Sequence, residues 1–188
     1  MSTHLRLALP PLEALAPHSH IAFALIDGRG RVLRSGEQAL QHLAGTVPTR
    51  RTHAILHPGD AVVTTVDMPP LPSNRLGDAV MARIEPLVLG DVQTLCIAHG
   101  PRQADGRMTV AWANRRPLLQ AWRYLHEAGL NIRALVPHEL ALPSGDPQPD
   151  VALTLPADSR WLGRLPTWSL ARPEWRADSG ARRWGACL

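Results

Sequence analysis

The sequence predicts a mixed α/β domain in which helices pack on a sheet, and three observations lead to this prediction. Short apolar runs typical of strands alternate along residues 20–136 with two longer amphipathic segments typical of helices. Hydrophobic residues make up 45% of the 188 residues, which is enough for a real core and argues against disorder. Clusters of Gly, Pro and Asp separate the runs, as expected where tight turns join neighbouring strands.

Strands are predicted from apolar runs that turn-forming residues bound. The first two, residues 20–26 and 30–36, flank a turn at Asp27, and a short helix over residues 37–43 follows them. The last predicted strand leads into a short helical turn. The later strands are expected, in chain order, over residues 52–57, 61–68, 95–99, 107–113 and 131–136.

Two longer helices are predicted from apolar residues at steps of three and four. The first spans residues 74–87 and is expected to end near its proline, Pro86, which cannot continue a helix. The second spans residues 117–127, with Pro117 at its start and Gly129 just past its end. The expected buried stripes are Leu76, Ala79, Val80, Ile84 and Leu87 in the first helix and Leu118, Ala121, Trp122 and Leu125 in the second.

Composition divides the chain into a domain over residues 1–143 and a tail over residues 144–188. The segment PSGDPQP, residues 143–149, has the composition of a linker. Residues 151–155 are the candidate for an added edge strand, and the prolines that follow exclude a long regular element.

The charge of the chain is concentrated at its C-terminal end. All 20 basic residues are arginines, and the whole excess of +4 lies in residues 160–188. Residues 1–159 are electroneutral overall, which argues against nucleic-acid binding. Proteins that bind nucleic acid usually carry a basic stripe on the folded domain. Arg and Trp together are typical of the cytoplasmic flank of a membrane helix, where Arg meets anionic lipid. The membrane-proximal candidates are Arg172, Arg176, Arg182, Arg183 and Trp184.

No strong catalytic or metal-binding motif is present. The sequence lacks a Gly-x-Ser-x-Gly elbow and, without lysine, cannot form a Walker-type phosphate loop. His53 and His57 have the spacing of a helical zinc pair, but in a strand residues four apart lie about 13 Å apart. We therefore expect no metal. Cys96 and Cys187 show no disulfide framework and are expected to be reduced thiols of a cytosolic domain.

The stretch ALIDGRGRVLRSGE, residues 24–37, leaves two interpretations open. A strand that runs into Asp27, Gly28 and Gly30 is compatible with the phosphate loop of an actin-like ATPase, which makes these residues weak nucleotide candidates. The same residues are also typical of a tight turn between paired strands. No second Asp-Gly-x-Gly follows, which favours the turn.

The polar face of the second helix is a further candidate surface. Arg116, Gln120, Arg123 and Glu127 share this face at helical spacing. Solvated faces are the norm on amphipathic helices, and the alternative is a face that docks a partner.

Two blocks, residues 63–102 and 121–143, resemble the cytoplasmic domain of the type II secretion system protein L family. The matching motifs are Val-x5-Pro-Pro-Leu-Pro at residues 63–72, Glu-Pro-Leu at the helix end, His-Gly at a strand end and Ala-Gly-Leu after the second helix. The resemblance extends over roughly residues 20–175. It implies an RNase H-like, actin-related fold without a catalytic role.

Members of that family resemble adaptors, and the resemblance sets the functional expectations. The cytoplasmic part recruits the hexameric secretion ATPase, the E component, and the membrane and periplasmic parts pair with the M component. We therefore expect no enzymatic activity, no cofactor, a place at the cytoplasmic face of the bacterial inner membrane, contact with anionic lipid and a possible homodimer. The family's membrane helix and periplasmic domain do not follow Leu188, so we expect a truncated form of a single-pass protein.

Two alternatives stay open at this point. One is an actin-like ATPase that binds nucleotide through Asp27, Gly28 and Gly30. The other is the related cytoplasmic adaptor of type IV pili, which would need a nucleotide site and no membrane-edge tail.

Overall fold

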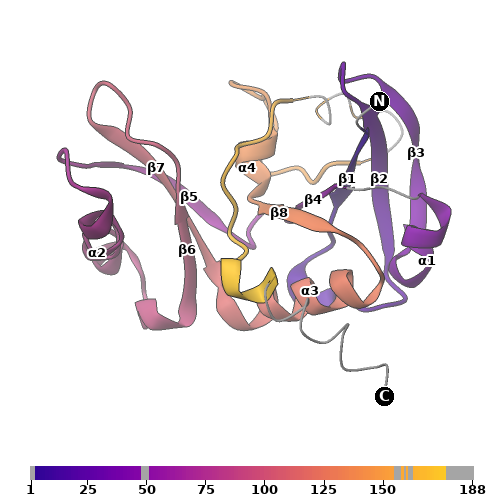
Figure 1. Cartoon of the computed structure of the whole chain (residues 1–188), viewed down its shortest axis with the longest axis horizontal. Helices are drawn as coiled ribbons and strands as arrows, with labels where there is room; N and C mark the ends of the chain where they lie inside the picture. Colours follow the sequence, from indigo (N-terminus) through magenta and orange to yellow (C-terminus); the bar gives the residue numbers. More distant parts are fainter. Residues whose placement is uncertain (1–2, 48–50, 155–157, 159, 161–162, 177–188) are drawn as a thin grey trace.

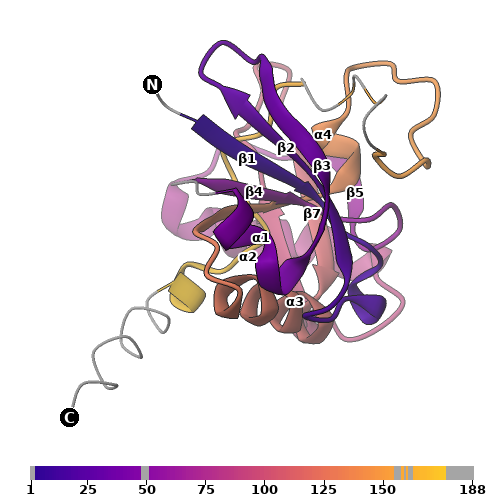
Figure 2. The same ribbon diagram turned by 90° about the vertical axis from the view of Figure 1, so that its right-hand side faces the viewer.

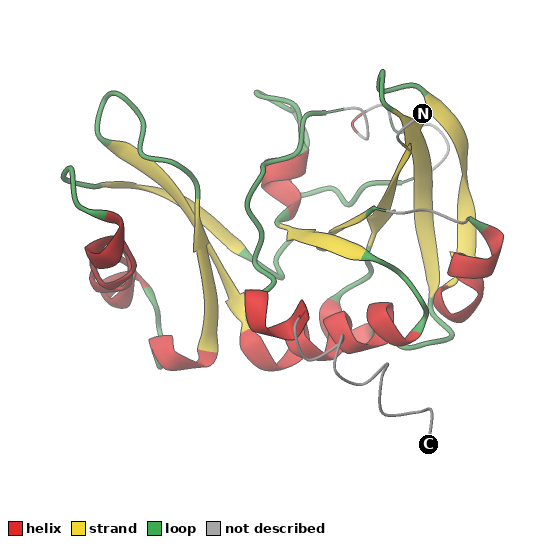
Figure 3. Ribbon diagram, in the orientation of Figure 1, coloured by secondary structure: helices red, strands yellow, loops and turns green. Residues whose placement is uncertain are grey.

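The chain folds into a five-stranded sheet and a three-stranded sheet that stand side by side (Figure 1). The computed structural model describes residues 3–47, 51–154, 158, 160 and 163–176. Helices lie below and outside the two sheets, and the short helix α4 lies between them (Figure 3), so the mixed α/β class predicted from the sequence is confirmed.

The larger sheet has the strand order β3-β2-β1-β4-β8. Strand β2 runs antiparallel to both of its neighbours, whereas β1, β4 and β8 run parallel to one another. One antiparallel strand among four parallel ones, in this order, is the RNase H-like arrangement that the family resemblance implies. The strands are β1 (Thr3–Ala8), β2 (His20–Asp27), β3 (Val32–Ala39), β4 (Thr52–Ile55) and β8 (Ile132–Val136).

Strand β1 is absent from the elements predicted above, yet it lies at the centre of the sheet. Leu5 and Leu7 are fully buried, and they alternate with His4 and Arg6, which are half-buried. The apolar run is therefore interrupted at every second residue, because the two faces of this strand meet different surroundings. Alternation of Leu5, Leu7 and Leu9 was the available signal.

The end of the first hairpin also differs from the prediction. A helix was expected over residues 37–43, but β3 continues to Ala39 and α1 spans Leu40–Thr46. Glu37 and Gln38 pair with Ala22 and Ile21 of β2. The long ladder with β2 keeps these residues extended, so pairing overrides their helical propensity.

A second lobe is inserted between β4 and β8. It carries an antiparallel sheet of order β5-β7-β6, whose one face is covered by α2. Its other face, with Cys96, Ala111 and Ala113, joins the core of the main lobe. The elements are β5 (Val62–Asp67), α2 (Ser73–Ile84), η2 (Glu85–Leu87), η3 (Val92–Thr94), β6 (Leu95–His99) and β7 (Arg107–Asn114).

Helix α2 ends where its proline predicts. The last helical residue is Ile84, and the turn η2 follows through Pro86. Val80 and Ile84 are buried against the small sheet, but Leu87 is 54% exposed because it lies beyond the end of the helix. The expected stripe is therefore correct except for Leu87.

Helix α3 (Arg115–Glu127) follows β7 directly and crosses beneath the larger sheet (Figure 2). Its stripe of Leu118, Ala121, Trp122 and Leu125 is buried as predicted. Together with α1 it covers the face of the sheet that carries Leu5. The opposite face is covered in part by α4 (His138–Ala141) and by Leu153, and a short turn, η1 (Leu12–Ala14), links β1 to β2.

Residues 163–176, called the strap here, run back over the domain. Leu170 and Ser169 lie beside β8: the backbone N–H of Leu170 donates to the carbonyl of Leu135 at 3.1 Å, and the N–H of Leu135 donates to Ser169 Oγ at 2.8 Å. Trp175 is 9% exposed, and its ring centroid lies 6.0 Å from that of Trp122. The strap therefore covers the edge of β8 and completes the core.

The strap also contacts the inserted lobe. A Cβ atom added at Gly100 would lie 2.9 Å from Nε1 of Trp168, so the indole packs directly on the glycine backbone. Residues 151–154, the described part of the expected edge strand, adopt no strand conformation. The edge of β8 that such a strand would extend is occupied instead by Ser169 and Leu170.

We expect Trp175→Ala to lower the free energy of unfolding by about 3 kcal/mol, because it removes a buried indole and leaves a cavity beside Trp122. Urea denaturation measures the loss. The control is Leu33→Ala, at a side chain that is 53% exposed, which should change stability by less than about 0.5 kcal/mol. Equal effects of the two substitutions would show that the strap adds nothing to the core.

Candidate functional site

Asp27 forms a closed turn between β2 and β3. Its carboxylate accepts hydrogen bonds from the backbone N–H groups of Arg29 and Arg31 at 2.8 and 2.9 Å and from Nε of Arg31 at 2.9 Å. The N–H of Arg31 is the main cause that lowers the pKa of Asp27. Gly30 has φ +82°, a conformation that favours glycine, and Gly28 lies within the same turn. The carboxylate therefore stabilises the turn of its own β-hairpin.

The position of Asp27 in the sheet also matters. Open α/β sheets bind ligands at the carboxyl ends of their parallel strands. Asp27 ends the antiparallel strand β2 and is paired with Thr3, the first residue of β1. It therefore lies at the amino ends of the parallel strands, away from the place where such a sheet holds a nucleotide.

The carboxyl ends of β4 and β8 border one small cavity. A cavity of about 20 Å³ lies there, lined among others by His57, Pro58, Pro137 and His138. Small-molecule sites usually measure several hundred Å³, so this cavity has no room for a nucleotide. His138 is 4% exposed, and burial lowers its pKa, which keeps the ring neutral at pH 7.

The polar face of α3 is open to solvent. Arg116, Gln120, Arg123 and Glu127 are all exposed, as their spacing predicts. The buried stripe on the other side of α3 fixes the orientation of this face. The four side chains therefore form one continuous polar strip on the exposed side of a helix whose other side is anchored in the core.

The membrane-proximal candidates do not form a single patch in the described part of the chain. Arg172 is half-buried and lies near Cys96. Burial raises the pKa of the Cys96 thiol, and Arg172 and Arg115 lower it by a smaller amount. Arg176 is exposed and donates a hydrogen bond to the carbonyl of Arg133. The remaining candidates, Arg182, Arg183 and Trp184, lie outside the described residues.

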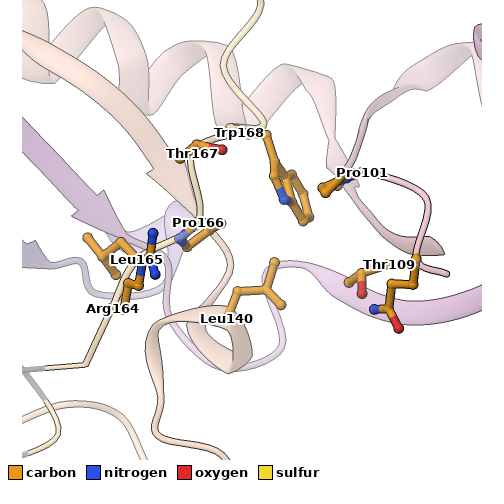
Figure 4. Close-up of a pocket in the computed structure, with 10 residues that line it drawn as sticks. Pro101, Thr109, Leu140, Arg164, Leu165, Pro166, Thr167 and Trp168 are labelled. Carbon is orange, nitrogen blue, oxygen red and sulfur yellow. The ribbon is translucent and has the colours of Figure 1, made fainter. Parts of the chain in front are cut away.

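Between the strap and the inserted lobe lies a larger cavity of about 390 Å³. Figure 4 shows Trp168, Pro101 and Leu140 around it, and Arg164 is the one charged residue among those that line it. A lining this apolar lacks the paired titratable groups that acid–base catalysis requires.

Sequence reasoning missed a group of cationic side chains beside His53. The rings of His53 and His4 lie 6.0 Å apart. The pKa of His53 falls to about 4, first because the ring is buried and then because His4, Arg6, Arg51 and Arg133 repel its positive form. The spacing of His4 with Arg6 and of Arg51 with His53, two apart on neighbouring strands, was the available signal.

The two histidines that have helical zinc spacing are not brought together. His53 belongs to β4, whereas His57 lies beyond the strand and donates from Nδ1 to the carbonyl of Pro58 at 2.8 Å. Over residues 3–47, 51–154, 158, 160 and 163–176, no three His, Cys, Asp or Glu side chains are arranged to hold a metal.

Across the same residues, no helix has the length and apolar character needed to cross a bilayer.

Comparison with known proteins identifies a family. The sequence model described as "Type II secretion system (T2SS), protein L" matches residues 26–174 of the chain. A search of curated protein sequences found no match.

Solved structures give the same fold. The cytoplasmic domain of EpsL, an inner membrane component of the type II secretion system of Vibrio cholerae, is 20% identical with a TM-score of 0.62; the match covers 77% of this chain and 61% of that one. The "PilM-PilN type IV pilus biogenesis complex" is 13% identical with a TM-score of 0.57, over 74% of this chain and 48% of that one. The chain thus spans less than two thirds of the first structure and about half of the second, and at these identities the likeness establishes the fold alone.

Acid should destabilise the domain through His53. Its pKa is about 4 in the folded chain against 6.5 ordinarily, so the unfolded chain binds more protons between these values. The stabilising contribution is complete above pH 6.5 and is lost as the pH falls towards 4. Because the site is partly open to solvent, we expect a loss of about 1–2 kcal/mol.

Urea denaturation at pH 7.5, 5.5 and 4.5 measures this loss. His53→Asn should reduce the loss of unfolding free energy between pH 7.5 and 4.5. His18→Asn, at an exposed histidine, should leave that loss unchanged. Identical pH profiles for the wild type and His53→Asn would contradict the assignment.

Proposed function

The chain belongs to the protein L family of type II secretion systems, and from this membership we propose that it is a non-catalytic adaptor that docks the secretion ATPase to the inner-membrane platform. The observation that carries the proposal is the family match over residues 26–174, which takes in both lobes and most of the strap. The related domain of Vibrio cholerae comes from an inner membrane component.

The geometry of the sheet supports a role without catalysis. The acidic candidate Asp27 is hydrogen-bonded within its own turn and lies at the amino ends of the parallel strands. At the carboxyl ends of β4 and β8, the cavity of about 20 Å³ beside His138 is too small for a nucleotide. A fold of the actin-related class thus serves here as a rigid support for binding surfaces.

The polar face of α3 is the surface that we assign to the ATPase. It is exposed along three turns, and Leu118, Trp122 and Leu125 anchor the helix from behind. Arg116 and Arg123 present guanidinium groups, which favour bidentate contacts with carboxylates of a partner. A preorganised polar strip of this kind lowers the ordering cost of docking.

The basic C-terminal end is assigned to the membrane. Arg176 and the sequence beyond it, with Arg182 and Arg183, supply positive charge that attracts anionic headgroups on the cytoplasmic face. In a full-length protein this side would face the M component and the bilayer. A homodimer is compatible with the exposed surfaces of the domain.

The second candidate function is that of a type IV pilus adaptor. The likeness to the PilM-PilN complex favours it at the level of fold. This alternative requires a nucleotide site, and the cavity of about 20 Å³ beside His138 is too small to be that site. The family match favours the secretion adaptor.

The double substitution Arg116→Glu and Arg123→Glu should weaken capture of the cognate secretion ATPase at least about tenfold. The reason is that two guanidinium donors become carboxylates, which repel the acidic side chains expected on the partner surface. Pull-down with purified ATPase measures capture, and thermal melts confirm folding. The matched control is Arg75→Glu with Arg83→Glu, two exposed arginines of α2. If only the control variant lost ATPase capture, the result would contradict the assignment to α3 and would indicate an interface on the inserted lobe.

Isothermal titration with Mg-ATP should show no micromolar binding that depends on Asp27. The reason is that its carboxylate already accepts three hydrogen bonds within the β2–β3 turn. Asp27→Asn is titrated beside the wild type. Micromolar binding that Asp27→Asn abolishes would exclude the purely non-catalytic adaptor.

A further inference from the structure

Three separate parts of the chain enclose the cavity of about 390 Å³ beside the strap. Leu140 of α4 forms one wall, and Pro101 and Thr109 of the inserted lobe form another. Trp168 and its neighbours in the strap form the third wall. In the view of Figure 4, Trp168 and Leu140 face each other across the space, with Arg164 on one side and Thr109 on the other. A cavity of this volume falls within the usual range of small-molecule sites.

The hydrophobic core holds the apolar walls of this cavity in place. Leu140 and Leu165 pack against the buried cluster on the α4 side of the larger sheet. Trp168 packs against the main core, and its indole lies directly on the backbone of Gly100. A ligand therefore meets a surface that is already formed, which lowers the entropy cost of binding.

Arg164 is the one charged residue among the described residues that line the cavity, and its side chain is exposed. In the part of the chain that the structure describes, its guanidinium group has no hydrogen-bond or ion-pair partner. Asp158, the acidic residue that precedes it in the described chain, pairs instead with Arg160 at 2.8 Å. One unpaired guanidinium group beside an apolar space favours a ligand that carries a single negative charge.

We propose that this cavity binds an apolar monocarboxylate, with its hydrocarbon body between Trp168 and Leu140 and its carboxylate on the guanidinium group of Arg164. Removal of the hydrocarbon from water supplies the main driving force. The guanidinium group offers two parallel N–H donors, which match the two oxygens of a carboxylate. Because Arg164 is exposed, the carboxylate stays close to water and its desolvation costs little.

Other classes of ligand fit this cavity less well. A di- or triphosphate carries several negative charges, and the described lining offers a single cation to balance them. A cationic ligand would be repelled by Arg164. A wholly apolar ligand would leave the guanidinium group without a partner, so it should bind more weakly than the matching carboxylate.

This site is separate from the surface assigned to the secretion ATPase. The polar strip of α3 contributes no residue to the described lining of the cavity. The proposal therefore stands or falls independently of the adaptor role.

Binding is tested by calorimetric titration of the whole chain at pH 7.5 with two carboxylates, octanoate and 4-phenylbutyrate. The control ligands are 1-octanol and octylamine, which keep the aliphatic body of octanoate but replace its carboxylate by a neutral group or a cation. Octanoate should bind at least about tenfold more tightly than either control. Binding of octanoate alone would identify an aliphatic ligand, and binding of 4-phenylbutyrate alone would identify an aromatic one.

Three variants make the test specific. Arg164→Gln should weaken carboxylate binding at least about tenfold and leave the binding of 1-octanol unchanged. Arg164 is exposed and unpaired in the described structure, so this variant is expected to fold. Thr109→Phe places a ring in the cavity from β7 and should weaken the binding of every probe. Arg29→Gln makes the same charge change on the β2–β3 turn and should leave all binding unchanged.

Tryptophan NMR gives an independent readout of the position of the ligand. The indole N–H resonance of Trp168, identified by its absence in Trp168→Phe, should shift when octanoate saturates the chain. The resonance of Trp122, which is buried in the core, should stay in place. The proposal is overturned if neither carboxylate binds at millimolar concentration, if octylamine or 1-octanol binds as tightly as octanoate, if Arg164→Gln binds like the wild type, or if the Trp168 resonance does not move.

Discussion

The central strand β1 is the constraint on which the rest of the structure depends. It pairs antiparallel with β2 and parallel with β4, so the whole larger sheet is built outward from it. Its leucines enter the core shared with α3, while His4 and Arg6 face the other way. A slip of one residue in its register would place His4 and Arg6 in the core, and for this reason the alternation along β1 decides which side chains enter the core.

The strap is the second long-range element that the fold requires. The edge of β8 would expose unpaired backbone groups, and hydrogen bonds with Ser169 and Leu170 satisfy those of Leu135. The same segment packs Trp175 on Trp122 in the main lobe and Trp168 on Gly100 in the inserted lobe. The relative position of the two lobes is thus fixed by a stretch of chain whose composition is that of an irregular tail.

The charged groups of the β2–β3 turn and of α3 have different surroundings. Asp27 is the acidic residue whose sequence context resembles a phosphate loop. Its carboxylate accepts three hydrogen bonds from Arg29 and Arg31 within its own turn. Helix α3 carries the exposed charges of Arg116, Arg123 and Glu127 on the side opposite its buried stripe. The two regions thus differ: the carboxylate of Asp27 is hydrogen-bonded within the domain, whereas the polar side chains of α3 face solvent.

The sequence by itself determined the features that depend on local periodicity: the mixed α/β class, the buried stripe of α3, the end of α2 at Pro86 and the turn at Asp27. Only the tertiary structure decided the central place of β1, the strap along β8 and the position of Arg6 beside His53. Each of these depends on pairing between distant residues, as between Arg6 and His53 or between Leu135 and Leu170. The physical reason is that periodicity reports which side of an element is apolar, whereas register across a sheet depends on which strands meet.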